Sequence, residues 1–216
     1  MASRPQPTRV RKLPDERRAE ILRSAARIAL EEGLERITLR RVADELGVRP
    51  GLIGHYFPAA DTLVAEAFTD AATKERDTLL PADEEGLAPI DRLARFLVRL
   101  ADGTYLDLSR LWLNARHLSR FKEGLRDAVG AQETVTRTAL TALIEAGVVA
   151  GEFDTDDALG AALHILVTVD GLGSYANANA DADAHGRLDH PVLDDMAITT
   201  AERELGLERG TLRARL

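Results

Sequence analysis

The chain has no cysteine among its 216 residues. This absence excludes disulfide scaffolds, thiol nucleophiles and zinc sites built on thiolate ligands, and it fits a protein that folds in a reducing compartment. Long apolar segments are missing too: no run reaches the roughly 18 uncharged apolar residues typical of a membrane span, and residues 1–14 lack the apolar core of a secretory signal. We therefore expect a cytoplasmic protein without a membrane segment.

Patterns typical of enzymes are also missing. The chain has five histidines, but it shows no glycine-rich phosphate loop, no paired carboxylates at catalytic spacing and no Ser/His/Asp arrangement. We therefore expect that the protein is not an enzyme and uses no cofactor.

A low-complexity stretch, residues 177–190, contains side chains of the types that bind divalent cations: Asp181, Asp183, His185, Asp189 and His190. No recognised ligand spacing relates these residues, and the composition is that of a mobile loop. We predict a loop here and no metal site.

The net charge of −8 argues at first against a nucleic-acid partner, but the charge is unevenly distributed. Residues 1–58 contain 12 Lys and Arg against 8 Asp and Glu, whereas the rest of the chain contains 16 against 28. Arg4, Arg9, Arg11 and Lys12 precede the first acidic residue on a proline-containing segment. Such a basic arm could follow DNA phosphates or enter a minor groove, or it could be a solvated tail with incidental charge.

Residues 38–57, TLRRVADELGVRPGLIGHYF, have the pattern of two short helices around a tight turn. Thr38 can cap the first helix through its hydroxyl, and Gly47 can end it in the left-handed conformation. Pro50 suits the first position of the second helix because its missing N–H is not needed there. This pattern is typical of a helix-turn-helix motif, although an ordinary corner in an all-α core would fit the spacing as well.

Helical periodicity continues along the chain and no strand pattern interrupts it. We predict further helices over residues 15–32, 61–80, 89–101, 105–121, 123–146 and 191–206, and one that follows Asp154–Asp156 and ends near residue 175. This last helix is apolar on nearly every side, which predicts burial in the core and in a subunit interface. The predicted fold class is all-α, with about nine helices.

The segment from Arg17 to Phe68 resembles the DNA-binding domain of the tetracycline-repressor (TetR) family of bacterial one-component transcriptional regulators. The matching positions are Ile21, Ala25, Ala26, Gly33, Thr38, Val42, Ala43, Leu46, Gly47, Val48, Gly51, Tyr56 and Phe57. Within the family, the wording GLIGHYF is most similar to the betaine-regulator (BetI-like) branch.

The resemblance implies two domains: an N-terminal arm and three-helix helix-turn-helix domain over residues 1–58, and a helical effector-binding and dimerisation domain over residues 59–216. It also implies a DNA-binding regulator, usually a repressor, that binds a palindromic operator as a homodimer and is released by a small-molecule effector. A helical protein-binding adaptor without sequence-specific DNA binding is the alternative.

Carried over by position, the resemblance places these residues against DNA: Thr38, Arg40, Arg49, Pro50, Gly51, Leu52, His55 and Tyr56. Phe57 is expected in the core. Gly54 and Ala60 depart from the family, where tyrosine and lysine are common, and so remove contacts that Arg40, Arg41 or the arm would have to offset.

The same resemblance places an effector pocket among the middle helices and a dimer interface on the last two long helices. Candidate effector-binding residues are Tyr105, Trp112, Asn114, Arg116, His117, Phe121, His164, Thr168, Asp170 and Tyr175, of which Trp112 and His164 are favoured. The last helix is expected to add Val192, Leu193, Met196, Ile198 and Leu205 to the interface, and the tail after it is expected to be loosely held.

Overall fold

The computed structural model describes residues 13–101, 105–178 and 190–215. These residues form nine α-helices and no strand, which confirms the predicted all-α class. The helices are α1 (Pro14–Glu32), α2 (Leu39–Leu46), α3 (Pro50–Tyr56), α4 (Ala60–Leu79), α5 (Pro89–Ala101), α6 (Tyr105–Leu118), α7 (Glu123–Val149), α8 (Ala158–Ala178) and α9 (Pro191–Glu204). The basic residues of the arm, Arg4, Arg9, Arg11 and Lys12, lie outside the described residues.

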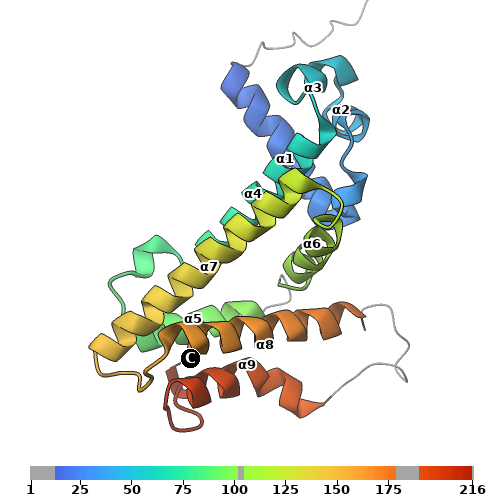
Figure 1. Cartoon of the computed structure of the whole chain (residues 1–216). Helices are drawn as coiled ribbons and strands as arrows, with labels where there is room; N and C mark the ends of the chain where they lie inside the picture. Colours follow the sequence, from blue (N-terminus) through green and yellow to red (C-terminus); the bar gives the residue numbers. More distant parts are fainter. Residues whose placement is uncertain (1–12, 102–104, 179–189, 216) are drawn as a thin grey trace, which may run out of the picture.

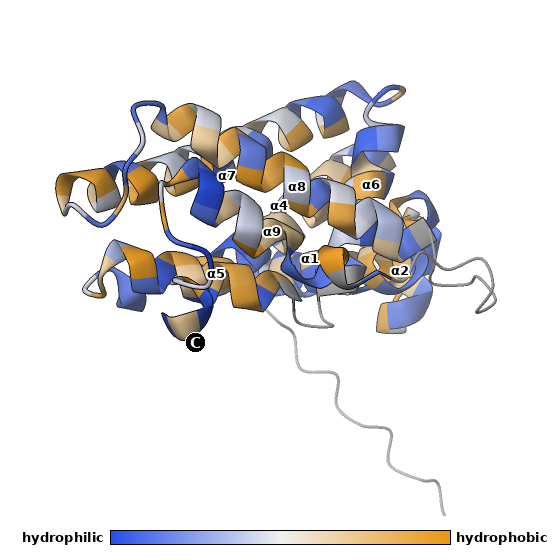
Figure 2. Ribbon diagram, turned by 90° about the horizontal axis from the view of Figure 1, so that it is seen from below, coloured by the Kyte–Doolittle hydropathy of each residue, from blue (hydrophilic) through white to orange (hydrophobic). Residues whose placement is uncertain are grey.

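The helices are arranged as two ends joined by two long struts (Figure 1). Helices α1, α2 and α3 lie at one end, and α5, α8 and α9 lie at the other. Helices α4 and α7 pack side by side along the length between them, while α6 contacts both α1 and α8. Figure 2 shows the same helices coloured by hydropathy, with hydrophobic and hydrophilic residues both present along α5, α8 and α9.

Two apolar clusters form the core. The first contains the buried side chains of α1 to α4 together with Leu111, Trp112, Leu125 and Val129 of α6 and α7. The second is built from α5, α7, α8 and α9 and includes Phe96 and Ile165. Helices α1, α2 and α3 form the end that the family resemblance predicts to bind DNA, called the DNA-reading end below. Because the first cluster continues past residue 58 into later helices, this end is packed directly onto the rest of the molecule. The domain boundary at residue 58 stays a prediction.

The local signals of the helix-turn-helix motif have the predicted geometry. The Thr38 hydroxyl accepts a hydrogen bond from the Arg41 backbone N–H at 3.0 Å, which caps α2. Gly47 follows α2 in the left-handed conformation with φ 62° and ψ 36°, and Pro50 is the first residue of α3. Three residues, 47–49, therefore separate α2 from α3, and Gly47 supplies the left-handed backbone conformation of this turn.

Helix α8 is only partly covered within the single chain. Its segment Ala158–Asn177 has the length and composition of a membrane span, a test that core helices of soluble proteins also pass. Within the chain 28% of its most apolar window is buried, and the expected burial of the rest in a subunit interface stays a prediction. Helices α6, α7 and α9 cover one side of α8, and a stripe of apolar residues is left exposed on the other: Leu159, Leu163, Val167 and Tyr175.

The C-terminal segment after α9 is held more firmly than predicted. Leu205 is fully buried in the second cluster and so is not part of an exposed interface. The buried Glu202 carboxylate accepts hydrogen bonds from the backbone N–H groups of Gly210 (2.9 Å) and Leu212 (3.0 Å), and Leu212 itself is buried. The expectation of a loose tail was wrong, because a single carboxylate in α9 pairs with backbone groups that the sequence pattern does not mark.

The loop predicted over residues 177–190 lies mostly outside the described residues, and so do Asp181, Asp183, His185 and Asp189. His190 is described, and its Nδ1 accepts the Val192 N–H at 3.1 Å, which caps α9. Among the described residues, no group of three or more His, Asp or Glu side chains is arranged to hold a metal ion.

Candidate nucleic-acid interface and effector cavity

The surface of α2 and α3 exposes most of the residues predicted to contact DNA. Thr38, Arg40, Arg49, Pro50, Gly51 and His55 are exposed, and Leu52 and Tyr56 are half-buried. Ile53 and Phe57 point into the first cluster, where both are buried. One side of α3 therefore packs on the core while the other side, with the residue that precedes it, faces solvent.

Two arginines on this surface are available for an external partner. The Arg40 side chain is 85% exposed, and its nearest carboxylate, on Asp44, is 3.9 Å away. Within the described part of the chain, the Arg49 side chain takes part in no hydrogen bond or ion pair. Both guanidinium groups can approach phosphates or base edges without first breaking a strong internal contact.

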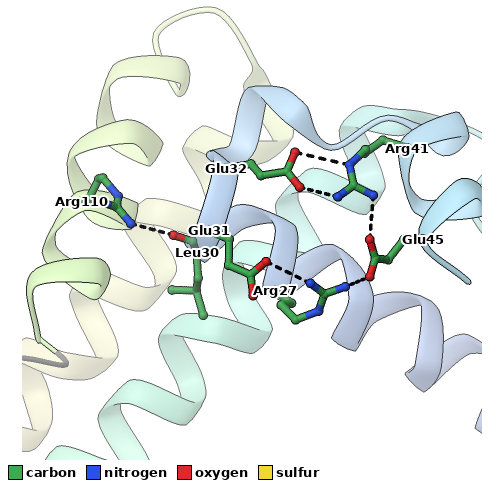
Figure 3. A network of polar contacts seen from close by, with 7 residues as sticks. All are labelled: Arg27, Leu30, Glu31, Glu32, Arg41, Glu45 and Arg110. Carbon is green, nitrogen blue, oxygen red and sulfur yellow. Dashed lines mark hydrogen bonds and ion pairs between the residues drawn. The ribbon is translucent and has the colours of Figure 1, made fainter.

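The other arginines nearby are held by carboxylates in a network that joins α1 to α2 (Figure 3). Arg41 donates hydrogen bonds to Glu32 and, at 2.8 Å, to Glu45, while Arg27 pairs with Glu31 at 2.9 Å and also with Glu45. The hydrogen bond from Arg41 lowers the pKa of the Glu32 carboxyl. Arg41 therefore joins α2 to α1, and it is not free to offset the contacts that Gly54 and Ala60 remove.

The two departures from the family pattern have simple surroundings. Ala60 is the first residue of α4, and Ala59 before it supplies no side-chain cap. Gly54 has room for a larger residue, since an added Cβ would contact only Leu39 Cδ1, at 3.9 Å. The missing side chain at Gly54 thus reflects no tight packing.

At the other end, a cavity of about 270 Å³ lies among α4, α5, α6, α7 and α8. Its apolar wall consists of Leu79, Leu80, Phe96, Leu100, Leu163, Leu166, Val167 and Val169. Its polar lining consists of Glu75, Arg76, Trp112, Arg116, Glu133, Thr136, Arg137 and Asp170. An apolar enclosure with a few convergent polar groups is the usual form of a small-molecule site.

Three of the predicted effector residues line this cavity: Trp112, Arg116 and Asp170. Six lie away from it: Asn114, His117, Phe121, His164, Thr168 and Tyr175. The Phe121 side chain is 73% exposed, and the His164 side chain is 64% exposed and hydrogen-bonded to Glu204 on α9. His164 was favoured as a member of a buried helix, but it lies on the exposed side of that helix. Tyr105 begins α6, and its side chain lies outside the described part of the chain.

The sequence reasoning missed Glu75. It lies on α4 between the buried residues Ala71, Ala72 and Leu79, at helical spacings of three and four. An acidic residue on an otherwise apolar helix face is a signal that could have identified it, because such groups are almost never buried without a reason.

Glu75 and Trp112 form the inner polar contact of the cavity. The Trp112 indole Nε1–H donates a hydrogen bond of 2.6 Å to Glu75 Oε2, and the edge of the Phe68 ring packs on Trp112. Burial raises the pKa of the Glu75 carboxyl to about 7; the nearby Asp170 adds to this rise, and the Trp112 bond and Arg116 oppose it. The carboxyl is therefore close to half-ionised at neutral pH.

Arg116 holds two other carboxylates of the cavity. Its Nε donates to Glu133 Oε1 at 2.9 Å and its Nη2 donates to Asp170 Oδ2 at 2.8 Å. Its guanidinium carbon also lies 5.2 Å from the centre of the Trp112 ring. These contacts join α6 to α7 and α8 across the cavity.

Helix α6 also contacts the DNA-reading end. The Asn114 amide oxygen accepts the Leu34 backbone N–H at 2.8 Å, and its Nδ2 donates to Glu35 at 3.0 Å. Arg110 Nη2 donates to the Leu30 carbonyl at 3.0 Å (Figure 3). The helix that supplies Trp112 and Arg116 to the cavity is thus hydrogen-bonded to the end of α1 and to the segment that leads into α2.

Residues 21–67 match the family model described as bacterial regulatory proteins of the tetR family. The HTH-type transcriptional regulator PksA of Bacillus subtilis (strain 168) is 26% identical over 116 residues, which cover 53% of this chain and 57% of PksA. The chain thus aligns with little more than half the length of that relative.

Similarity to solved structures extends over most of the chain. A TetR-family transcriptional regulator from Rhodococcus sp. superposes with a TM-score of 0.73 at 20% identity, covering 88% of this chain and 99% of the other. A TetR transcription regulator from Haloarcula marismortui superposes with a TM-score of 0.72 at 25% identity, covering 89% and 97%.

Proposed function

We propose that this chain is a DNA-binding transcriptional regulator of the TetR family, and that it is a repressor that binds a palindromic operator as a homodimer and leaves DNA when a small molecule enters the cavity. The observation that carries this proposal is the position of α6, which contributes side chains to the cavity and hydrogen bonds to the DNA-reading end. The predicted similarity to the betaine-regulator branch stays a prediction.

DNA contact is assigned to the exposed surface of α2 and α3. Arg49 stands at the start of α3, where an arginine can read guanine O6 and N7, and His55 lies nearly two helical turns further along. Arg40 and Thr38 are placed at the start of α2 for phosphates, and Tyr56 is placed to reach one through its hydroxyl. Specificity then falls mainly on Arg49, Leu52 and His55.

The homodimer is assigned to the outer face of α8 together with α9. Leu159, Leu163, Val167 and Tyr175 follow one another at intervals of four or eight residues, so they lie along a single stripe of α8, of which Leu163 and Val167 also form the edge of the cavity. Val192 at the start of α9 is also exposed. A second copy that packs α8 and α9 against the same helices would bury this stripe in a four-helix bundle.

Release from DNA is assigned to a shift of α6. A molecule that enters the cavity contacts Trp112 and Arg116, and Arg116 is tied to α7 and α8 through Glu133 and Asp170. Any displacement of α6 alters the hydrogen bonds of Arg110 and Asn114 to the DNA-reading end. The effector releases DNA if it binds the shifted state more tightly than the state that fits the operator.

The test of operator binding uses duplexes selected by the full-length protein from a random library. We expect a palindrome with two half-sites, and we expect the affinity, measured by fluorescence anisotropy, to fall steeply as salt rises because phosphate contacts release counterions. Failure to enrich any duplex, or binding without salt dependence, would leave a protein-binding adaptor as the better function.

The dimer is tested with Leu159→Glu, which places a charge on the stripe outside the cavity lining. We expect this variant to sediment as a monomer and to bind the palindrome far more weakly. The control is Val149→Glu, at an 89% exposed position at the end of α7, which should remain a dimer. Wild-type protein that sediments as a monomer at micromolar concentration would contradict the proposal.

A further inference from the structure

We propose that the effector of this regulator is a protonated amine on an apolar body, and that the Glu75 carboxylate accepts a hydrogen bond from its N–H group. This inference rests on the proposed function, since it names the class of molecule that the cavity binds.

The first step concerns the free acceptor. Glu75 is only 8% exposed and lines the cavity. Its Oε2 accepts the Trp112 hydrogen bond, while within the described part of the chain Oε1 has no hydrogen-bond partner. Oε1 is not among the fully buried polar atoms that lack a partner, so it is open to the cavity, and a ligand that brings a donor to it gains a hydrogen bond there.

The second step concerns the sign of the charge. Arg116 is the cation near Glu75, but its guanidinium already pairs with both Glu133 and Asp170. Arg76 donates to Gln132 Oε1 at 2.8 Å, and Arg137 donates to Thr134 at 3.3 Å. With Arg76 and Arg137 the lining holds three arginines against three carboxylates, so it is formally neutral when all are ionised. Around Glu75 itself the balance is negative, because Arg116 is the cation that acts on it and is already shared by Glu133 and Asp170, and this favours a cationic group next to the Glu75 carboxylate.

The third step concerns the kind of cation. A quaternary ammonium has no N–H to donate and is usually held against several aromatic faces. Here Trp112 carries Arg116 over its ring and Phe68 at its side, which leaves Phe96 as the one other aromatic residue of the lining. The open Oε1 atom is instead suited to a primary or secondary ammonium group, whose N–H gives a charge-assisted hydrogen bond.

The rest of the ligand is apolar. Eight leucine, valine and phenylalanine side chains form the remaining wall, including Leu79, Leu100 and Leu166. They can bury a hydrocarbon chain or ring but offer it no hydrogen bond. With a volume of about 270 Å³, the cavity accepts a small amine.

The experiment uses four probes with the same hexyl chain: hexylammonium, hexan-1-ol, hexanoate and hexyltrimethylammonium. Binding to the full-length protein without DNA is followed at pH 8 through the fluorescence of Trp112, the sole tryptophan. We expect hexylammonium to bind about tenfold or more tighter than each of the other three, because it alone gives Glu75 a charged donor.

Two variants separate Glu75 from general charge. Glu75→Gln keeps an acceptor for Trp112 and should weaken hexylammonium binding by about tenfold or more while leaving hexan-1-ol binding unchanged. Asp61→Asn removes one negative charge from the same helix at an exposed position that is paired, within the described residues, only with Lys122, outside the cavity lining, and it should bind all four probes as the wild type does. Circular dichroism checks that both variants are folded.

Tightest binding of hexanoate would overturn the assignment in favour of an anion site at Arg116. Equal binding of hexyltrimethylammonium and hexylammonium, or no effect of Glu75→Gln, would overturn it as well. DNA release is measured separately on the selected palindrome. If hexylammonium binds through Glu75 but leaves the complex with DNA intact, the proposed release of DNA by an effector is wrong, whereas the proposed class of ligand is supported. If another compound releases DNA while hexylammonium does not bind, the proposed class of ligand is wrong, whereas the proposed function as an effector-responsive regulator is supported.

Discussion

The two ends of the molecule place their charged side chains differently. At the DNA-reading end, Arg27 and Arg41 pair with carboxylates at the surface. The core beneath these ion pairs consists of apolar side chains such as Ile21 and Phe57. At the other end, Glu75 is buried beside a cavity, whereas Arg116 of the same lining is as exposed, at 35%, as Arg41, at 33%. A domain that binds DNA has to hold its helices in one arrangement, whereas a domain that binds an effector has to change its conformation when the ligand arrives. A buried acidic group beside a cavity lowers the stability of that region, so the conformational change requires less free energy.

The largest expected effect tests the closed core of the DNA-reading end. Phe57→Ala removes a ring that is fully buried in the first cluster and should lower the free energy of unfolding by about 3–5 kcal/mol. Leu100→Ala, in the half-buried wall of the cavity, is the matched change and should cost clearly less. Denaturant unfolding followed by circular dichroism measures both. Equal losses would show that the two ends are packed alike.

The next prediction concerns the buried acid. Since the pKa of Glu75 rises from 4.5 to about 7 on folding, the native state keeps a proton that the unfolded chain has lost between these pH values. The contribution of Glu75 to the free energy of unfolding is therefore largest below about pH 4.5. It falls by roughly 3 kcal/mol in total as the pH rises through 7. Glu75→Gln should therefore unfold about as easily as the wild type at pH 5 but be more stable by up to roughly 3 kcal/mol at pH 8.

The control for this pH effect is Glu133→Gln, which removes a half-exposed cavity carboxylate paired with Arg116. It should gain no stability between pH 5 and pH 8. If the Glu75→Gln variant shows the same difference from the wild type at both pH values, burial of Glu75 does not hold its proton.

A smaller effect is expected at the reading surface. Arg49→Ala removes an exposed side chain without internal partners, so it should leave stability unchanged and lower preference for one base-pair position by about 1–3 kcal/mol. Competition binding with single-position variants of the selected palindrome measures this. Arg40→Ala serves as the comparison and should weaken all sequences alike if Arg40 contacts a phosphate. Unchanged preference in the Arg49→Ala variant would remove that residue from base reading.

The smallest expected effect is at Gly54. An added Cβ meets only ordinary contact with Leu39, so Gly54→Ala should stabilise α3 by up to about 1 kcal/mol. Thermal unfolding measures the gain, and a loss of stability would show that the helix needs the glycine. Gly47→Ala is the contrasting change, and it should destabilise because Gly47 has a positive φ.

Local chemistry made the DNA-reading end predictable. Thr38, Gly47 and Pro50 act on backbone groups within a few residues of themselves, so their roles as cap, stop and first helical residue could be inferred from order alone. The helix periodicity and the uneven charge were equally local properties. The ends of helices were less certain. The helix predicted to end at residue 146 continues through Gly147 to Val149, and Gly147 is a glycine because the Phe153 ring occupies the space of a side chain there.

The composition of the cavity was not predictable in this way. Trp112, Arg116 and Asp170 were named among ten candidates, but polarity on an apolar helix could not separate them from His164 or Phe121, which face solvent. Which side of α8 is covered depends on how α6, α7 and α9 pack against it, and that packing joins residues far apart in the chain.

The amino-acid sequence by itself thus determined the all-α class and the helix-turn-helix geometry, and it marked the residues predicted to contact DNA, since each depends on spacing within one or two helices. Only the tertiary structure decided that Arg41 is held by Glu32 and Glu45, that the C-terminal tail is bound by Glu202, and that Glu75 meets Trp112 in a cavity. These contacts join helices that are distant in sequence, and their formation depends on the packing of the whole chain.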